Sequence, residues 1–378
     1  MSNQSNMQLY KFPLIYAFIV IMLTCCSKKD DKINTALIEK SSITESEMSK
    51  LSECVESIKI VPLETNDSIL IGQIDAIKVR GSQIYILSAH KLYHFDSAGN
   101  FVGLFNLVGP APGEVRYLTD FDIADGYCYV MATDKIIIRN LNMPTDFREI
   151  SPLQSGGKIR KINEGIIASF ERPFPNGNSV MLFAESGDTI CSMVSIGDYQ
   201  GRPTTIDFIE YRAGEYLHYS SGNDLDVVIP ADKRSYKMTF VENDEAASTK
   251  EINEAKRRSE VNGEIIVGMA HSKSHLLLLG LNKDKINFYL YDRNTGLTKT
   301  FDDSIEDDIS GIADIQQNMM LGMIGFNESD NDYFISVIDP NTTYQYITDK
   351  PNKFSDSYQS LNGVDSDANP AVIFIKFK

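Results

Sequence analysis

Tryptophan is absent from this sequence of 378 residues, and cations are scarce relative to anions. The 36 lysines and arginines are outnumbered by 52 aspartates and glutamates, which gives a formal net charge of −16 at pH 7. A protein with this charge repels phosphate backbones, so we exclude nucleic acid as a partner. The lack of tryptophan weakens a platform for stacking on sugars, although 18 tyrosines and 19 phenylalanines leave a glycan ligand open.

Signatures of known catalytic sites are also absent. The sequence has no Gly-x-Ser-x-Gly elbow, no His-Glu-x-x-His motif, no Walker loop and no dinucleotide-binding glycine pattern. His271 and His275 are four residues apart and could bind zinc from one helix face, but residues 265–279 predict strand, turn and strand. Acidic runs that could attract calcium lack the spacing of a calcium-binding loop; they are residues 302–303, 307–308 and 328–332. We therefore predict no cofactor, with calcium as the alternative, and favour a protein that is not an enzyme.

Cysteine is rare as well, and its five positions divide into two groups. Cys54, Cys128 and Cys191 are widely spaced and odd in number, which is typical neither of a disulfide framework nor of a zinc knuckle. We interpret them as small buried hydrophobic residues, with one disulfide among them as the alternative. Cys25 and Cys26 are adjacent and follow a hydrophobic run.

That hydrophobic run, residues 12–24, is too short to span a bilayer, because a spanning helix needs roughly 20 apolar residues. It resembles the core of an export signal. Leu23 lies three residues before Cys26 with small side chains between them, a spacing similar to the bacterial lipoprotein box. We predict a signal peptide at residues 1–25 and lipidation of Cys26, with Cys25 as acceptor or an uncleaved signal anchor as the alternatives. Acyl chains on the cysteine would hold the protein at a membrane without a transmembrane helix.

The residues after the anchor are polar and charged. Lys28-Lys29-Asp30-Asp31 resembles the lysine-then-acidic tag by which some Gram-negative gut anaerobes export lipoproteins to the cell surface. This similarity predicts an outer membrane lipoprotein that faces the cell exterior. Few large apolar residues occur in residues 26–53, which predicts a tether or linker.

From residue 54 onward, short apolar or alternating runs are bounded by Gly, Asn, Asp or Ser, which is typical of brief strands in an all-β fold. Runs of this kind are residues 57–63, 74–79, 84–87 and 92–95. A hairpin recurs whose turn combines an acidic residue with Gly or Asn-Thr. Its copies are residues 95–101, 183–189, 291–297 and 338–344.

These hairpins indicate a repeated four-stranded unit. We place the first strands of six units near residues 73, 118, 158, 204, 263 and 309. Spacings of roughly 40 to 60 residues compare with the blades of a β-propeller. Residues 57–63 and 371–377 are left over, and their pairing would close the ring and remove its free edges. We therefore predict one six-bladed propeller domain at residues 54–378, with a helical excursion at residues 244–260.

Several stretches are similar to the six-bladed β-propeller lipoproteins of gut anaerobes. They are residues 51–65, Ile71-Gly72-x-Ile74, Ile84-Tyr85-Ile86-Leu87, Pro112-Gly113-Glu114 and Asn369-Pro370-Ala371-Val372-Ile373. This resemblance covers nearly all of the chain after the signal peptide and implies an NHL-like propeller at the outer membrane. The family's loop reads Gly-x-Gly-Pro-Gly-Glu, whereas this chain has alanine at position 111, which predicts a stiffer loop.

That loop is our candidate site. Pro112-Gly113 predicts a type II turn in a connection that crosses the mouth of the central channel. Glu114, Arg116 and Tyr117 would stand near this mouth as binding residues. In the alternative interpretation, Glu114 bonds loop amides and pairs with Arg116.

We thus predict a monomeric, non-catalytic propeller that binds a protein, peptide or glycan partner through one face. The alternative is a hydrolase or lyase that acts on a saccharide or lactone at the channel, with carboxylates as acid and base. Acidic residues of the expected inner strands that could serve this chemistry are Asp120, Asp122, Asp207 and Glu210.

Overall fold

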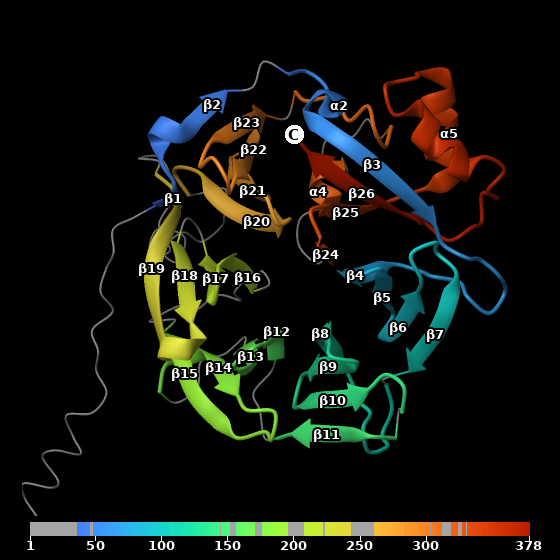
Figure 1. The fold of residues 1–378 in the computed structure, drawn as a ribbon. Helices are drawn as coiled ribbons and strands as arrows, with labels where there is room; N and C mark the ends of the chain where they lie inside the picture. The colour runs from blue at the N-terminus through green and yellow to red at the C-terminus, as the bar shows by residue number, and fades with distance from the viewer. Residues whose placement is uncertain are drawn as a thin grey trace, which may run out of the picture.

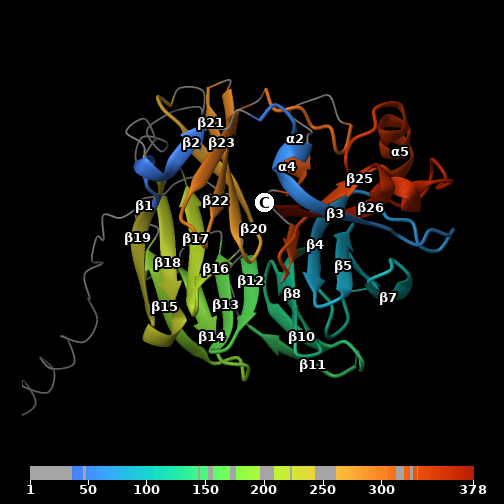
Figure 2. The same cartoon turned by 45° about the horizontal axis from the view of Figure 1, so that its top comes forward.

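The described part of the chain is a wheel of six small sheets around a central axis (Figure 1). The computed structural model describes residues 36–45, 48–106, 108–143, 145–151, 156–170, 176–195, 208–221, 224–242, 261–283, 285–302, 304–311, 319–323, 327–329 and 331–378. In Figure 2 the sheets stand as upright blades. The predicted all-β, six-bladed β-propeller is therefore confirmed. The predicted signal peptide, Cys26 and the helical excursion at residues 244–260 lie outside the described residues.

Each of the first five blades contains four consecutive antiparallel strands. Blade 1 is formed by β4 (Ile74–Arg80), β5 (Gln83–Ser88), β6 (Lys91–Phe95) and β7 (Phe101–Asn106). Blade 2 is formed by β8 (Leu118–Ala124), β9 (Tyr127–Ala132), β10 (Ile136–Asn140) and β11 (Phe147–Ile150). Blade 3 is formed by β12 (Gly156–Ile162), β13 (Gly165–Phe170), β14 (Asn178–Phe183) and β15 (Thr189–Ser195).

Blades 4 and 5 continue this order. Blade 4 is formed by β16 (Ile209–Arg212), β17 (Glu215–Ser221), β18 (Asp224–Ile229) and β19 (Arg234–Val241), with the 3-10 turn η2 (Pro230–Asp232) before its last strand. Blade 5 is formed by β20 (Ile265–His271), β21 (His275–Asn282), β22 (Lys285–Asp292) and β23 (Thr298–Asp302). The predicted unit starts near residues 73, 118, 158 and 263 agree with these strands, while the fourth blade's inner strand begins at residue 209 instead of 204.

The sixth blade joins the two ends of the described chain. Its sheet has the order β25 (Phe334–Ile338), β26 (Ala371–Phe377) and β3 (Val55–Pro62). The antiparallel pairing of β3 with β26, which we call the seam, has seven residue pairs from Ala371 opposite Pro62 to Phe377 opposite Val55. The predicted closure of the ring by these segments is confirmed. The short strand β24 (Asn327–Ser329) pairs in parallel with β4 of blade 1, which adds a second connection between blades 6 and 1.

Two predictions for the last unit were wrong. No strand begins within the described residues 304–311, because residues 308–310 form a turn in which the Asp307 carboxylate accepts bonds from the Ile309 and Ser310 amides. Residues 338–344 are not a hairpin turn, because the helix α5 (Pro340–Asp349) begins there. The side chain of Asp339 accepts a bond from the Thr342 amide, and proline occupies the first turn, so this Asp-Pro pair starts a helix.

Four helical segments of the described residues border the sixth blade. They are α2 (Leu51–Cys54), α4 (Met319–Met323), α5 and the 3-10 helix η5 (Ser355–Leu361). Met320 and Met323 of α4, together with Ile347 of α5 and Tyr358 of η5, belong to the apolar cluster that includes the seam residues Ile373 and Ile375. These helices therefore cover the apolar side of the seam.

Part of the expected tether belongs to the propeller. The strap, residues 36–45, contains β1 (Ala36–Ile38), the 3-10 turn η1 (Lys40–Ser42) and β2 (Ile43–Glu45). β1 pairs in parallel with β19, and β2 pairs in parallel with β23. The strap thus spans the outer edges of blades 4 and 5, as Figure 1 shows for β1 and β2.

The core is divided among the interfaces between blades. Six apolar clusters contain residues from neighbouring blades, for example Tyr85 of blade 1 with Phe121 of blade 2. Middle strands are buried on both faces, which explains why their sequences are nearly continuous apolar runs. Cys54 and Cys128 are buried free thiols in these clusters, and Cys191 is a half-buried free thiol. Burial raises the pKa of Cys54 to about 12, as expected for a structural cysteine.

Candidate functional site

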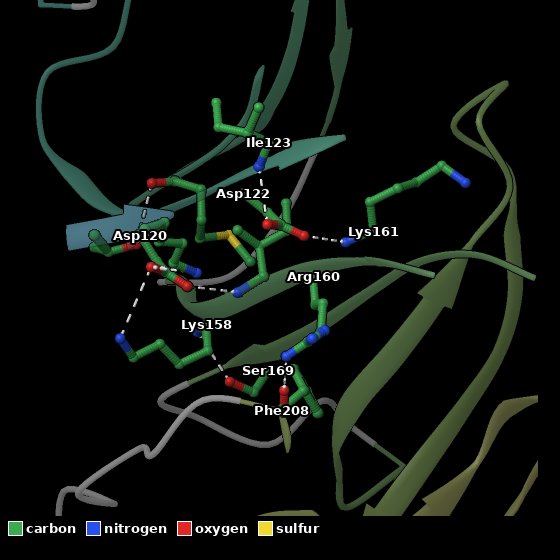
Figure 3. A network of polar contacts seen from close by, with 12 residues as sticks. Asp120, Asp122, Ile123, Lys158, Arg160, Lys161, Ser169 and Phe208 are labelled. Atoms are coloured by element: carbon green, nitrogen blue, oxygen red, sulfur yellow. Dashed lines mark hydrogen bonds and ion pairs between the residues drawn. The ribbon is translucent and has the colours of Figure 1, made fainter. Parts of the chain in front are cut away.

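Two aspartates of β8 form the centre of a polar network on the inner strands (Figure 3). Asp120 is 1% exposed, and its Oδ1 lies 3.4 Å from Lys78 Nζ and 3.8 Å from Lys158 Nζ. Its Oδ2 accepts a hydrogen bond of 3.0 Å from the Ile159 amide. Lys78 belongs to blade 1 and Lys158 to blade 3, so this carboxylate of blade 2 connects three blades.

Asp122 makes a parallel set of contacts one pleat further along β8. Its Oδ1 lies 2.6 Å from a terminal nitrogen of Arg80, and its Oδ2 accepts a bond of 2.8 Å from the Lys161 amide. The sequence suggested Asp120 and Asp122 as carboxylates of a hydrolase or lyase. In the structure both bind cations and amides of neighbouring blades, so their geometry fits a connection between blades. Asp207 lies outside the described residues, and Glu210 accepts a bond of 3.3 Å from the Gly214 amide at a surface turn.

Similar polar bridges occur at the other blade interfaces. Arg160 of blade 3 donates to the Phe208 carbonyl before blade 4, and Arg293 of blade 5 donates to the Tyr211 carbonyl of blade 4 at 2.7 Å. The Ser274 amide of blade 5 donates to Asp332 before β25 at 3.0 Å, and Asn331 donates to the Gly81 carbonyl of blade 1 at 3.0 Å. These bridges lie toward the end of the wheel where the first and second strands of each blade are joined, which we call the turn end.

The opposite end, the crossover end, carries the connections from one blade's outer strand to the next blade's inner strand. Residues 63–73 lead from β3 into blade 1, and residues 108–117 lead from blade 1 into blade 2. In the second loop the Glu114 amide donates to the Ala111 carbonyl at 3.0 Å, and Gly113 has φ of 78°. A positive φ at this position and that hydrogen bond agree with the predicted type II turn.

Glu114 shapes this loop from within. Its Oε2 accepts a hydrogen bond of 2.9 Å from the Ala111 amide. The carboxylate also lies against Gly109, where a Cβ would come within 1.9 Å of Oε2, so a larger residue at position 109 would displace this side chain. The Gly109 amide donates to the Val115 carbonyl at 3.1 Å. The structure thus favours a loop-forming role for Glu114, as in the alternative interpretation of the sequence.

A neighbouring carboxylate fixes the same loop to blade 2. Glu149 of β11 accepts a bond of 2.9 Å from the Gly113 amide and lies 3.0 Å from Lys135 Nζ. The amide of Gly113 and the ammonium of Lys135 lower the pKa of Glu149, because both stabilise its ionised form. The loop is therefore braced by blade 2 as well as by its own side chain.

Arg116 and Tyr117 are exposed on this braced loop. The Tyr117 side chain is 59% exposed, and its ring meets the His90 ring edge to face with 6.0 Å between the centroids. His90 and Ala89 form the two-residue turn between β5 and β6, with φ of 63° and 48°. Non-glycine residues in the left-handed region are strained, and such strain is found at functional sites. This turn was missed from the sequence because neither residue is a turn signal.

Leu70 completes a surface at the crossover end of blade 1. It is 58% exposed in the loop before β4, and its carbonyl accepts a bond of 3.3 Å from the Tyr93 hydroxyl of β6. The register brings the start of β4, the turn at residues 89–90 and the end of β7 to one end of the blade. We call Leu70, His90, Arg116 and Tyr117 the blade-1 patch.

Among the residues suggested for metal binding, both histidines and Asp308 have structural partners. His271 and His275 lie on successive strands β20 and β21, as the sequence predicted, and not on a helix. Burial lowers the pKa of His275, and its Nδ1 lies 2.8 Å from the Ser274 hydroxyl. Asp308 accepts bonds from the amide and hydroxyl of Ser52 at 2.9 and 2.6 Å. Within the described ranges, no group of three or more His, Cys, Asp or Glu side chains is placed to hold a metal ion.

The fold and these contacts define a six-bladed β-propeller with polar bridges at its turn end. The chain belongs to the family described as a domain of unknown function, DUF4934, which matches residues 35–376. No curated protein sequence matches the chain. Among the helices that the structure describes, none has both the length and the apolar character needed to cross a membrane.

One solved structure supports the fold, and others are similar to part of the chain. A protein of Bacteroides fragilis described as exported aligns with a TM-score of 0.71 at 17% identity, covering 90% of this chain and 99% of its own length. The extracellular domain of a protein described as a one-component system from B. thetaiotaomicron aligns with a TM-score of 0.41 at 10% identity, over 64% of this chain and 29% of its own. PorZ, a surface component of the type-IX secretion system of Porphyromonas gingivalis, gives a TM-score of 0.37 at 11% identity, over 64% and 28%.

Proposed function

We propose that this protein is a monomeric, lipid-anchored, non-catalytic propeller that faces the cell exterior and binds a protein, peptide or glycan partner through its crossover end. The observation that carries this proposal is the blade-1 patch, where exposed side chains stand on loops held by internal hydrogen bonds. Tyr117 and Arg116 are residue types that are enriched where proteins bind partners.

The difference between the two ends supports the choice of face. At the turn end, short turns and polar bridges join neighbouring blades. At the crossover end, the loop at residues 108–117 is longer and is fixed by Glu114 and Glu149. A loop that is already ordered loses little conformational entropy when a partner binds, and rigid scaffolds commonly carry binding residues on such loops.

The location follows from the N-terminal sequence. The hydrophobic run and the spacing of Leu23 and Cys26 support a lipid anchor, and Lys28 to Asp31 support surface display. The related fold of a B. fragilis protein described as exported agrees with this location. Replacement of Cys26 by serine should move the protein from the membrane fraction to the soluble fraction, and retention in the membrane would contradict the anchor.

The binding role is tested by capture with the soluble chain of residues 27–378. The immobilised chain is exposed to a glycan array and to surface-protein extracts, and the captured molecules are compared with those captured by an R116A/Y117A variant. We expect the variant to lose at least tenfold in affinity for a true partner, because truncation of a central aromatic or arginine contact costs about 2 kcal/mol or more.

A matched control separates the two ends of the wheel. Met143 is an exposed residue, 57% accessible, in the turn between β10 and β11 at the turn end. The M143A variant should capture the same partners as the unchanged chain. If R116A/Y117A also captures every partner with unchanged affinity, the blade-1 patch is not the binding surface and the proposal fails.

A further inference from the structure

A separate cavity of about 560 Å³ lies between the strap and blades 4 and 5. Its lining comes from three sources: the strap, the hairpin ends of blade 4 and the turn after β22 in blade 5. This volume is in the range of small-molecule sites, about 300–1,000 Å³. The cavity is across the wheel from blade 1 (Figure 1), so it does not depend on the function proposed for the blade-1 patch.

Three tyrosines dominate the cavity and come from three different strands. Tyr211 belongs to β16, Tyr236 to β19 and Tyr291 to β22. All three are half-buried at the open end of the apolar cluster between blades 4 and 5. Burial raises the pKa of Tyr236 and of Tyr291, so both rings carry neutral hydroxyl groups at pH 7. Such rings offer an apolar face and a polar edge to one ligand.

Hydrogen-bonding groups stand beside these rings. Arg212 lies over the Tyr211 ring, with 4.8 Å from its guanidinium carbon to the centroid, and donates to the Tyr211 hydroxyl at 3.2 Å. The carbonyl of Tyr211 accepts a bond from Arg293 of blade 5, which connects blades 4 and 5 at this tyrosine. Glu39 and Ser42 of the strap line the opposite wall. The cavity therefore combines apolar ring faces with donors and acceptors.

The charges narrow the class of ligand. A cationic ligand is disfavoured because Arg212 already occupies one aromatic face. An anionic ligand is disfavoured because Glu39 lines the cavity and the chain has a net charge of −16. A neutral ligand with an apolar face and many hydroxyl groups remains, and this description fits a pyranose ring.

We propose that this cavity binds a neutral saccharide, with the tyrosine rings stacking on sugar faces and with Arg212 and Glu39 bonding to hydroxyl groups. The strap supplies one wall of the site, so the bound sugar lies between an N-terminal segment and the body of the propeller. The site therefore places a sugar next to the segment that follows the predicted anchor.

The test measures binding of defined neutral hexasaccharides, namely malto-, cello-, xylo- and manno-oligosaccharides, to the chain of residues 27–378 by titration calorimetry. We expect at least one of them to bind, and we expect Y291A and Y236A each to weaken its binding about tenfold, the size of a lost aromatic contact. Because the chain has no tryptophan, tyrosine emission gives a second measure of occupancy.

A conservative variant, a variant at the rim and a variant far from the cavity serve as controls. Y291F retains the ring and should bind within a few fold of the unchanged chain, while E39A at the exposed rim should weaken binding with no change in thermal unfolding. Y117A, in the blade-1 patch, should bind the sugar as the unchanged chain does. A loss in Y117A alone would assign the sugar to the patch.

Three further outcomes would overturn this inference. Failure of every neutral hexasaccharide to bind would remove the ligand class. Tighter binding of a galacturonate hexamer or of a proline-rich peptide in the same cavity would show that the ligand is an acidic sugar or a peptide. Equal binding by Y291A, Y236A and E39A would show that the cavity is not the site.

Discussion

The seam and the strap both use N-terminal residues to extend a sheet, but they occupy different positions in the wheel. The seam is antiparallel and joins seven residue pairs, whereas β1 and β2 of the strap pair in parallel over two and three residues. The central seam residue Ile373 is fully buried, while most residues of the strap are exposed or half-buried. The seam completes a blade, and the strap lies on blades that already have four strands.

This difference indicates that the position of a strand in a closed ring contributes more to the stability of the protein than the strand's local β-propensity. Loss of the seam would expose the apolar clusters on both sides of blade 6, which contain residues of blades 5, 6 and 1. Loss of the strap would expose one outer groove. Because the ring is closed, the stability of the whole wheel depends on the pairing of β3 with β26. The stability of an open sheet would not depend on one such pair.

The largest effect is expected at the seam. The substitution I373D places a carboxylate where the native side chain is fully buried between β25 and β3. The variant buries an unpaired charge and loses a buried aliphatic side chain, and both changes destabilise the folded state. Because a typical domain is stable by only about 5–15 kcal/mol, we expect the two changes together to unfold much of the protein. We expect no cooperative transition in urea, measured by circular dichroism and tyrosine emission.

The same substitution in the strap provides the control. Ile43 of β2 is half-buried, and its backbone pairs with Thr298 at an outer edge. I43D should unfold cooperatively, with a loss of about 1 kcal/mol, because the carboxylate can reach solvent. Equal effects of I373D and I43D would contradict the view that closure decides stability.

A smaller effect is expected where side chains alone connect the blades. D120A removes the carboxylate that lies between the buried ammonium groups of Lys78 and Lys158. Removal of one partner from a buried ion pair costs roughly 3–5 kcal/mol. The matched exposed pair is Asp232 with Arg234, 3.1 Å apart with both side chains more than half exposed, and D232A should cost about 1 kcal/mol or less. Urea unfolding of both variants measures the difference between their losses of stability. Equal losses would show that the polar network in blades 1 to 3 is not needed for stability.

Much of the fold was predictable because its signals are local. The turns at residues 95–101, 183–189 and 291–297 join neighbouring strands as predicted, because an acidic side chain and a residue with positive φ make a tight connection. Asp96, for example, accepts bonds from the amides of Ala98 and Asn100. The prediction of a turn at residues 338–344 was wrong because an Asp-Pro pair is also a signal for the start of a helix. Only the residues that follow the pair decide between a turn and a helix.

The candidate sites were less predictable because their parts are distant in sequence. The type II turn at Pro112-Gly113 could be predicted from its residues, whereas its brace at Glu149 depends on the pairing of blade 2. The polar composition of the strap predicts a tether, because it gives no strand pattern and its partner β19 lies about 200 residues away. The three tyrosines of the cavity have no common spacing, so only the closed wheel brings them together.

Removal of the strap is expected to affect stability less than D120A does, and to have a large effect on the proposed saccharide site. A chain that begins at residue 48 loses the burial of Leu37 and Ile38, each worth about 1.5–3 kcal/mol. It also regains the backbone entropy that the strap loses on ordering, which opposes that loss. We expect a cooperative urea transition within about 2 kcal/mol of the chain that begins at residue 27. Saccharide binding should disappear, because one wall of the cavity is gone.

A shortened chain that fails to fold would show that the strap is as essential as the seam. A shortened chain that binds the sugar unchanged would show that blades 4 and 5 alone form the site.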